Sequence, residues 1–108
     1  MERFVLKRTG QRPLAFHGKR LFSGSTSPDR THPDYSGSPS NWMEVEVYRT
    51  QGGKFVLSIG RFSTYNGYKE RFRVLVFDSL EELVGYLEEE IPYWAEKVSL
   101  QLGVVEEL

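Results

Sequence analysis

The chain has 108 residues, with 14 Lys plus Arg, 15 Asp plus Glu, two His and no Cys, and 39% of its residues are hydrophobic. This length and composition are typical of one globular domain, 1–108, and they exclude disulfides and thiolate chemistry. The first apolar run contains only three residues before charge returns, which is too short for a signal peptide or a membrane span. We therefore expect a cytoplasmic protein that does not bind a membrane.

The charges are unevenly distributed along the chain. Residues 1–77 carry 13 Lys or Arg and six Asp or Glu, a net charge of +7, whereas residues 78–108 carry one Lys and nine acidic residues, a net charge of −8. The simpler interpretation is that the two parts neutralise each other within one fold. The alternative is a basic surface that binds nucleic acid or another anionic partner.

Alternation of apolar and polar side chains predicts about five strands before residue 78. The first two strands are expected at 3–7 and 14–22, joined by a turn at 9–13. Each of the other three strands has one apolar face, formed by Met43, Val45 and Val47, by Phe55, Leu57 and Ile59, and by Phe72, Val74 and Val76.

The loop at 51–53 sets the pairing of the first two of these three strands. A loop of three residues places Val47 opposite Leu57 and Val45 opposite Ile59, so that the apolar faces coincide. A loop of two residues would instead send both valines to the other face. The sequence therefore predicts a three-residue hairpin with a glycine in the left-handed region.

The next turn is expected at the Asn66-Gly67 dipeptide. Asn-Gly is the strongest short signal for a two-residue hairpin, because both turn positions need a positive φ. Counting back from this turn predicts that Ile59 pairs with Val74. Phe72, Val74 and Val76 would then lie on the same sheet face as Ile59.

Residues 23–41 are rich in Ser, Pro and Gly and contain one aromatic and no aliphatic side chain. This composition predicts a flexible loop, because the segment cannot bury enough apolar surface to order itself. Asp29, His32 and Asp34 within it are potential ligands for a divalent cation. Asp and Pro are more often turn formers in such a loop, so no metal site is predicted.

After Phe77 the apolar period changes from two to 3.6 residues. Ser79 and Glu82 form a capping-box pattern that predicts a helix start. Pro92 is suited to the first turn of a second helix, and Gly103 to its end. The predicted fold is α+β, with an antiparallel sheet of about five strands and two C-terminal helices packed on one face. The helix residues expected to face the sheet are Leu80, Leu83, Val84, Leu87, Ile91, Trp94, Ala95, Val98 and Leu102.

The chain contains no common catalytic or nucleotide-binding motif. His17 is flanked by Lys19 and Arg20, and no orienting acid is evident near it, so an ordinary strand histidine is the better interpretation. We expect neither an enzyme nor a cofactor.

The predicted register places aromatic and charged side chains together on the sheet face away from the helices. One row would contain Trp42, Phe62 and Arg71, and the next would contain Glu44 and Arg73. A cross-sheet salt bridge between Glu44 and Arg73 is expected there.

Aromatic rings beside basic side chains on a sheet are typical of proteins that bind single-stranded nucleic acid. The first hypothesis is a non-catalytic binding domain that contacts nucleic acid through this face. The alternative is a protein-interaction or homodimerisation domain that buries the same face, because its apolar set is too large to leave in water. The candidate binding residues are Trp42, Tyr48, Arg61, Phe62, Lys69, Arg71, Arg73, Lys19 and Arg20.

Overall fold

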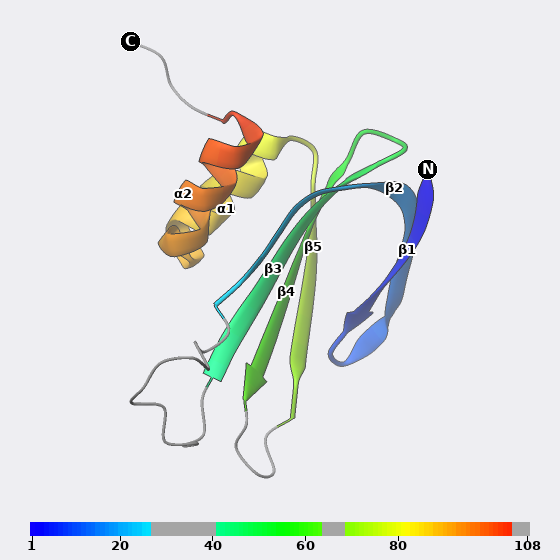
Figure 1. Ribbon diagram of the computed structural model, residues 1–108. Helices are drawn as coiled ribbons and strands as arrows, with labels where there is room; N and C mark the ends of the chain where they lie inside the picture. The colour runs from blue at the N-terminus through cyan, green and yellow to red at the C-terminus, as the bar shows by residue number, and fades with distance from the viewer. Residues whose placement is uncertain (27–40, 64–68, 105–108) are drawn as a thin grey trace.

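The computed structural model describes residues 1–26, 41–63 and 69–104. The strands form one antiparallel sheet in the order β1-β2-β3-β4-β5, followed by two helices (Figure 1). This confirms the predicted α+β fold. The elements are β1 (Glu2–Arg8), β2 (Gln11–Ser25), β3 (Asn41–Thr50), β4 (Phe55–Ser63), β5 (Arg71–Phe77), α1 (Leu80–Glu90) and α2 (Pro92–Leu102).

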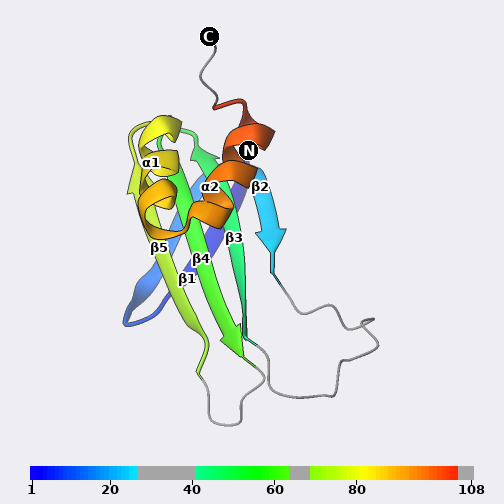
Figure 2. The same cartoon turned by 90° about the vertical axis from the view of Figure 1, so that its left-hand side faces the viewer.

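The sheet is curled into a half-barrel. β2 has 15 residues and pairs with β1 through its first half and with β3 through its second. The two outer strands of the sheet approach each other, since the Thr9 N–H donates to the Phe72 carbonyl at 2.9 Å and the Phe72 N–H donates to Thr9 Oγ1 at 2.7 Å. The helices cover the outer face, and the β1–β2 hairpin lies across the inner face (Figure 2). Both faces of the sheet are therefore covered in part.

The main core lies between the outer face and the helices. Val45, Val47 and Leu57 are 0% exposed, and Ile59 is 3% exposed. All four belong to the core cluster that also contains residues of both helices, as predicted. The helix residues buried in it are Leu83, Val84, Leu87, Trp94, Ala95 and Val98.

The hairpin between β3 and β4 has the predicted three-residue loop. Val45 pairs with Ile59 and Val47 pairs with Leu57. The Thr50 N–H donates to the Lys54 carbonyl at 2.8 Å, which closes the loop at 51–53. Gly53 has φ +87°, a left-handed conformation that glycine adopts without the steric cost of a Cβ.

The predicted register between β4 and β5 is wrong by one residue. Ile59 pairs with Arg73 rather than with Val74, and Leu57 pairs with Leu75. A shift of one residue exchanges the two faces of a strand. Leu75 and Phe77 therefore pack against the helix-side core. The Asn66-Gly67 turn itself lies outside the described residues.

The first turn is shorter than predicted. Arg8 pairs with Gln11, so the chain reverses at residues 9–10 rather than over 9–13. β2 then begins at Gln11 and includes Pro13, and the register shifts between Leu6 and Arg8. Proline is tolerated at such an irregularity because it removes no regular ladder hydrogen bond.

The predicted loop at 23–41 is partly strand. Residues 23–25 belong to β2 and pair with β3, where Gly24 lies opposite Val45. A Cβ at Gly24 would lie 2.5 Å from the Trp94 ring, so the absence of a side chain allows α2 to approach. Residues 27–40, including Asp29, His32 and Asp34, lie outside the described residues.

The helix boundaries follow the predicted signals. Ser79 caps α1 by accepting a hydrogen bond from the Glu82 N–H at 3.1 Å, and the Glu82 carboxylate accepts from the Asp78 N–H at 3.4 Å. Pro92 begins α2, and Gly103 ends it with φ +77°. The caps therefore fix where the apolar stripe of each helix meets the sheet.

The stabilities of two variants in β5 distinguish the observed pairing of this strand from the pairing that the sequence predicts. We expect Leu75→Ala to reduce the free energy of unfolding by about 2 kcal/mol, because Leu75 packs against the core. Val76 is 54% exposed, so Val76→Ala should change it by less than about 0.5 kcal/mol. Urea denaturation of both variants measures the difference. The reverse order would support the pairing of Ile59 with Val74.

Candidate functional site

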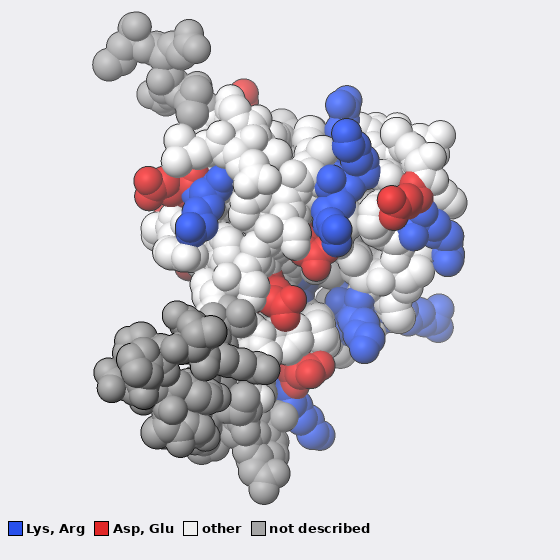
Figure 3. Space-filling model, viewed as in Figure 1, with Lys and Arg blue, Asp and Glu red and all other residues white. Residues whose placement is uncertain are grey.

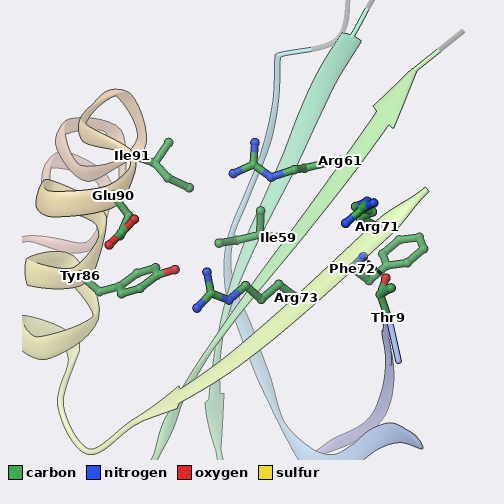
Figure 4. Close-up of a pocket in the computed structure, with 9 residues that line it drawn as sticks. All are labelled: Thr9, Ile59, Arg61, Arg71, Phe72, Arg73, Tyr86, Glu90 and Ile91. Carbon is green, nitrogen blue, oxygen red and sulfur yellow. Dashed lines mark hydrogen bonds between the residues drawn. The ribbon is translucent and has the colours of Figure 1, made fainter. Parts of the chain in front are cut away.

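A groove of about 340 Å³ lies between the β4–β5 side of the sheet and the end of α1 (Figure 4). Its strand wall carries three arginines, and its helix wall carries Tyr86, Glu90 and Ile91. Figure 4 shows Arg61 and Arg73 extending from the strands toward the helix wall. The described residues that line it are Thr9, Ile59, Arg61, Arg71, Phe72, Arg73, Tyr86, Glu90 and Ile91.

The strand register places the three arginines together. Arg61 lies directly opposite Arg71, and Arg73 lies two residues further along β5 on the same face. Like charges opposite each other on neighbouring strands are destabilising. Among the described residues, no carboxylate lies within ion-pairing distance of these three guanidinium groups. Arg73 lies over the Tyr86 ring, 5.7 Å from its centroid. The groove thus concentrates positive charge that the described part of the chain does not neutralise.

An aromatic hollow of about 410 Å³ adjoins this groove. Arg61 lines both spaces. The Trp42 and Phe62 rings are stacked, with centroids 5.4 Å apart and planes 15° apart. The arginine groove and an aromatic stack therefore share one side chain. The hollow is lined by Thr26, Asn41, Trp42, Met43, Arg61 and Phe62.

The sequence predicts one sheet face that carries both the arginines and the aromatic rings, but this face does not form. The arginines and the rings lie on opposite faces of the sheet. Trp42 and Phe62 lie on the inner face, while Arg71 and Arg73 lie on the outer face. The predicted Glu44–Arg73 salt bridge is absent among the described residues. Glu44 accepts a hydrogen bond from Trp42 Nε1 at 3.4 Å instead.

Tyr48 lies at the other end of the inner face and is only 3% exposed. The Phe4 and Phe16 rings cover it, with centroids 4.7 and 5.4 Å from its own. Its hydroxyl donates to the Glu46 carboxylate, and Arg20 lies 3.7 Å from the same carboxylate. Burial, and then this hydrogen bond and the Glu46 charge, raise the pKa of Tyr48 above its usual range. Tyr48 is therefore part of a second packed cluster.

The other predicted binding residues lie outside the groove lining. Lys19 and Arg20 are exposed on β2, and Lys69 is exposed just before β5. Six residues of the lining are not among the candidate binding residues of the sequence analysis, namely Thr9, Ile59, Phe72, Tyr86, Glu90 and Ile91. The sequence predicts Thr9 in a turn and Phe72 in the core, and the hydrogen bonds between Thr9 and Phe72 bring both to the groove. No local sequence signal carries that long-range contact.

Comparison with known proteins gives no match to a protein-family model, a curated protein or a solved structure. Within residues 1–26, 41–63 and 69–104, no group of three or more His, Asp or Glu side chains is arranged to hold a metal ion. No helix in this described part of the chain is long and apolar enough to span a bilayer.

The raised pKa of Tyr48 predicts an alkaline loss of stability. A tyrosine whose pKa is higher in the folded state stabilises the fold fully below its ordinary pKa of about 10, and this contribution is lost as the pH rises above that value. We expect the free energy of unfolding to fall more steeply above pH 10 in the wild-type protein than in Tyr48→Phe. Urea denaturation across this range measures the difference. The same slope in both proteins would contradict the assignment, and Tyr93→Phe, at a 56% exposed position, is the control.

The repulsion between Arg61 and Arg71 predicts a stabilising substitution. We expect Arg71→Gln to increase the free energy of unfolding by about 0.5 kcal/mol at low salt, with a smaller gain at high salt because of screening. Arg3→Gln is the control, since Arg3 lies opposite His17 rather than opposite a second arginine. Chemical denaturation at two ionic strengths tests this. A lower stability for Arg71→Gln would show that Arg71 contributes favourable contacts.

Proposed function

We propose that this protein is a non-catalytic domain that binds single-stranded nucleic acid, with the phosphates in the arginine groove and a base against the Trp42–Phe62 stack. The observation that carries this proposal is the convergence of Arg61, Arg71 and Arg73 on one groove without a carboxylate partner among the described residues. A phosphate can accept paired hydrogen bonds from the planar guanidinium group. An anion in the groove would also relieve the repulsion between the facing arginines.

The dimensions of the site favour a single strand over a duplex. The groove and the hollow, at about 340 and 410 Å³, are in the volume range of small-molecule pockets. A duplex keeps its bases stacked inside, whereas a single strand can place a phosphate in the groove and, past Arg61, which lines both spaces, an unstacked base against the rings on the inner face. Because every base has a π face, stacking on Trp42 and Phe62 would bind with little sequence preference.

The charge distribution supports binding of nucleic acid at one part of the surface rather than attraction by the charge of the whole molecule. The whole chain has a net charge of −1, so its overall charge does not attract nucleic acid. On the face in Figure 3, most Lys and Arg side chains lie over the strands rather than over the helices. Glu90 is the one acidic residue in the groove lining among the residues that the structure describes. Its charge opposes an anion there, so affinity should depend on the balance between Glu90 and the three arginines.

The alternative of a homodimer through the aromatic face has less support. Phe4 and Phe16 cover Tyr48 within one chain. Leu75 and Phe77 pack against the helix-side core. Much of the apolar set that suggested a partner on this face is therefore buried internally, and no partner is proposed there.

Fluorescence anisotropy with a labelled single-stranded oligonucleotide at two salt concentrations tests the proposal. We expect micromolar or tighter binding at low salt, with a salt dependence of log K that becomes shallower by about one unit for each phosphate contact removed. Arg71→Gln and Arg73→Gln should weaken binding several-fold each, and Glu90→Gln should strengthen it. Trp42→Ala should weaken binding by a stacking contribution of about 1–3 kcal/mol with an unchanged salt slope.

Arg49→Gln is a matched control, because Arg49 is exposed at the opposite end of the sheet from Arg61. It should bind like the wild-type protein. Absence of binding at micromolar protein in low salt would refute the proposal. Equal effects of Arg49→Gln and Arg73→Gln would show that any binding is diffuse rather than located in the groove.

A further inference from the structure

The three arginines of the groove are close neighbours on the outer face of the sheet. Arg61 lies directly opposite Arg71, so their Cα atoms are about 5 Å apart, and Arg73 lies about 7 Å further along β5. Ile59 lies opposite Arg73 and is 3% exposed, so it forms an apolar floor beside the three charges. Figure 4 shows Arg61 and Arg73 extending past Ile59 toward the helix wall. The guanidinium groups can therefore reach one small anion between the sheet and α1.

The charge of the lining matches an anion with two negative charges. Among the described residues that line the groove, three arginines and one glutamate leave a net charge of +2. A phosphodiester within a strand carries one negative charge and has two free oxygens. A phosphate monoester carries a charge of about −1.5 to −2 at pH 7 and has three acceptor oxygens. A monoester therefore balances the groove charge better and offers one oxygen to each guanidinium group.

The surroundings of the arginines fit a phosphate at the end of a strand. Arg73 lies over the Tyr86 ring, 5.7 Å from its centroid, which orients its guanidinium group before an anion binds. Arg61 lines both the groove and the hollow that holds the Trp42–Phe62 stack. A terminal nucleotide can thus place its phosphate on one side of Arg61 and its base on the other.

We propose that the arginine groove binds the terminal phosphate of a single strand in preference to the phosphodiesters within the strand. This inference rests on the proposed function and adds the chemical group that the groove recognises. The same phosphate monoester can come from the 5′ end or the 3′ end of a strand, and the experiment below distinguishes the two sources.

Competition fluorescence anisotropy against a labelled single strand without a terminal phosphate tests the inference. The competitors have one sequence and carry no terminal phosphate, a 5′-phosphate, a 3′-phosphate, or the monomethyl ester of either phosphate. We expect at least one phosphorylated strand to compete about fivefold more tightly than the unphosphorylated strand at low salt. This is roughly the effect of one further charge about 4 Å from a cation in a medium as polar as water. The methyl esters keep the size but lose the second charge, so they should lose most of this preference.

Variants of the groove should change the preference for the phosphorylated strand in opposite directions. Arg73→Gln should reduce it to less than about twofold, and Glu90→Gln should increase it, because a change of charge acts more strongly on a dianion than on a monoanion. Trp42→Ala should weaken all strands by the same factor, since stacking does not depend on the terminal phosphate. Arg49→Gln is the matched control and should keep the full preference, because Arg49 is exposed at the opposite end of the sheet from Arg61.

The outcomes separate this inference from the proposed function. Equal competition by all strands, with binding retained, would overturn the inference and leave the proposed function standing. Absence of binding by every strand would overturn both. A preference that survives Arg73→Gln, or that falls equally in Arg49→Gln, would overturn the assignment of the terminal phosphate to the groove. Circular dichroism and melting temperature confirm that each variant is folded.

Discussion

The pairing of Ile59 with Arg73 is the constraint on which the arrangement of this protein depends. It assigns every side chain of β5 to a face. Leu75 and Phe77 join the helix-side core, and Arg71 and Arg73 open into the groove beside α1. A shift of one residue would place Val74 in that core and remove two guanidinium groups from the groove. Core packing and the candidate site therefore follow from the same backbone pairing.

The curl of the sheet is the second organising feature. β2 is long enough to pair with β1 and then with β3, so the β1–β2 hairpin folds over the inner face. There Phe4 and Phe16 enclose Tyr48, while Thr9 reaches β5 and closes one side of the groove. The second half of β2 then continues beside β3, with Gly24 opposite Val45. One long strand thus links the hairpin over the inner face to the rest of the sheet.

The sequence predicted the elements and the helix-side core because several independent signals agree there. The loop at 51–53 fits only one register that keeps Val45 and Val47 on the buried side, and Ser79, Pro92 and Gly103 mark the helix ends. β5 gave no such agreement, since Val74, Leu75 and Val76 are all apolar and both faces of the strand are partly covered. The predicted pairing rests on the Asn66-Gly67 turn and on Phe72, Val74 and Val76 as the apolar face, but alternation cannot choose between this set and the set of Leu75 and Phe77. The groove depends on this pairing and on the distant contact of Thr9 with Phe72, so neither its lining nor its separation from the aromatic stack could be predicted.

Cross-strand nuclear Overhauser effects in the isotopically labelled protein test the central pairing most directly. The structure predicts backbone contacts that connect Ile59 with Arg73 and Leu57 with Leu75, together with side-chain contacts between Leu75 and the helices. Backbone contacts that connect Ile59 with Val74 and Leu57 with Val76 would contradict it. In that case Arg71 and Arg73 would lie on the inner face, and the arginine groove described above would not exist.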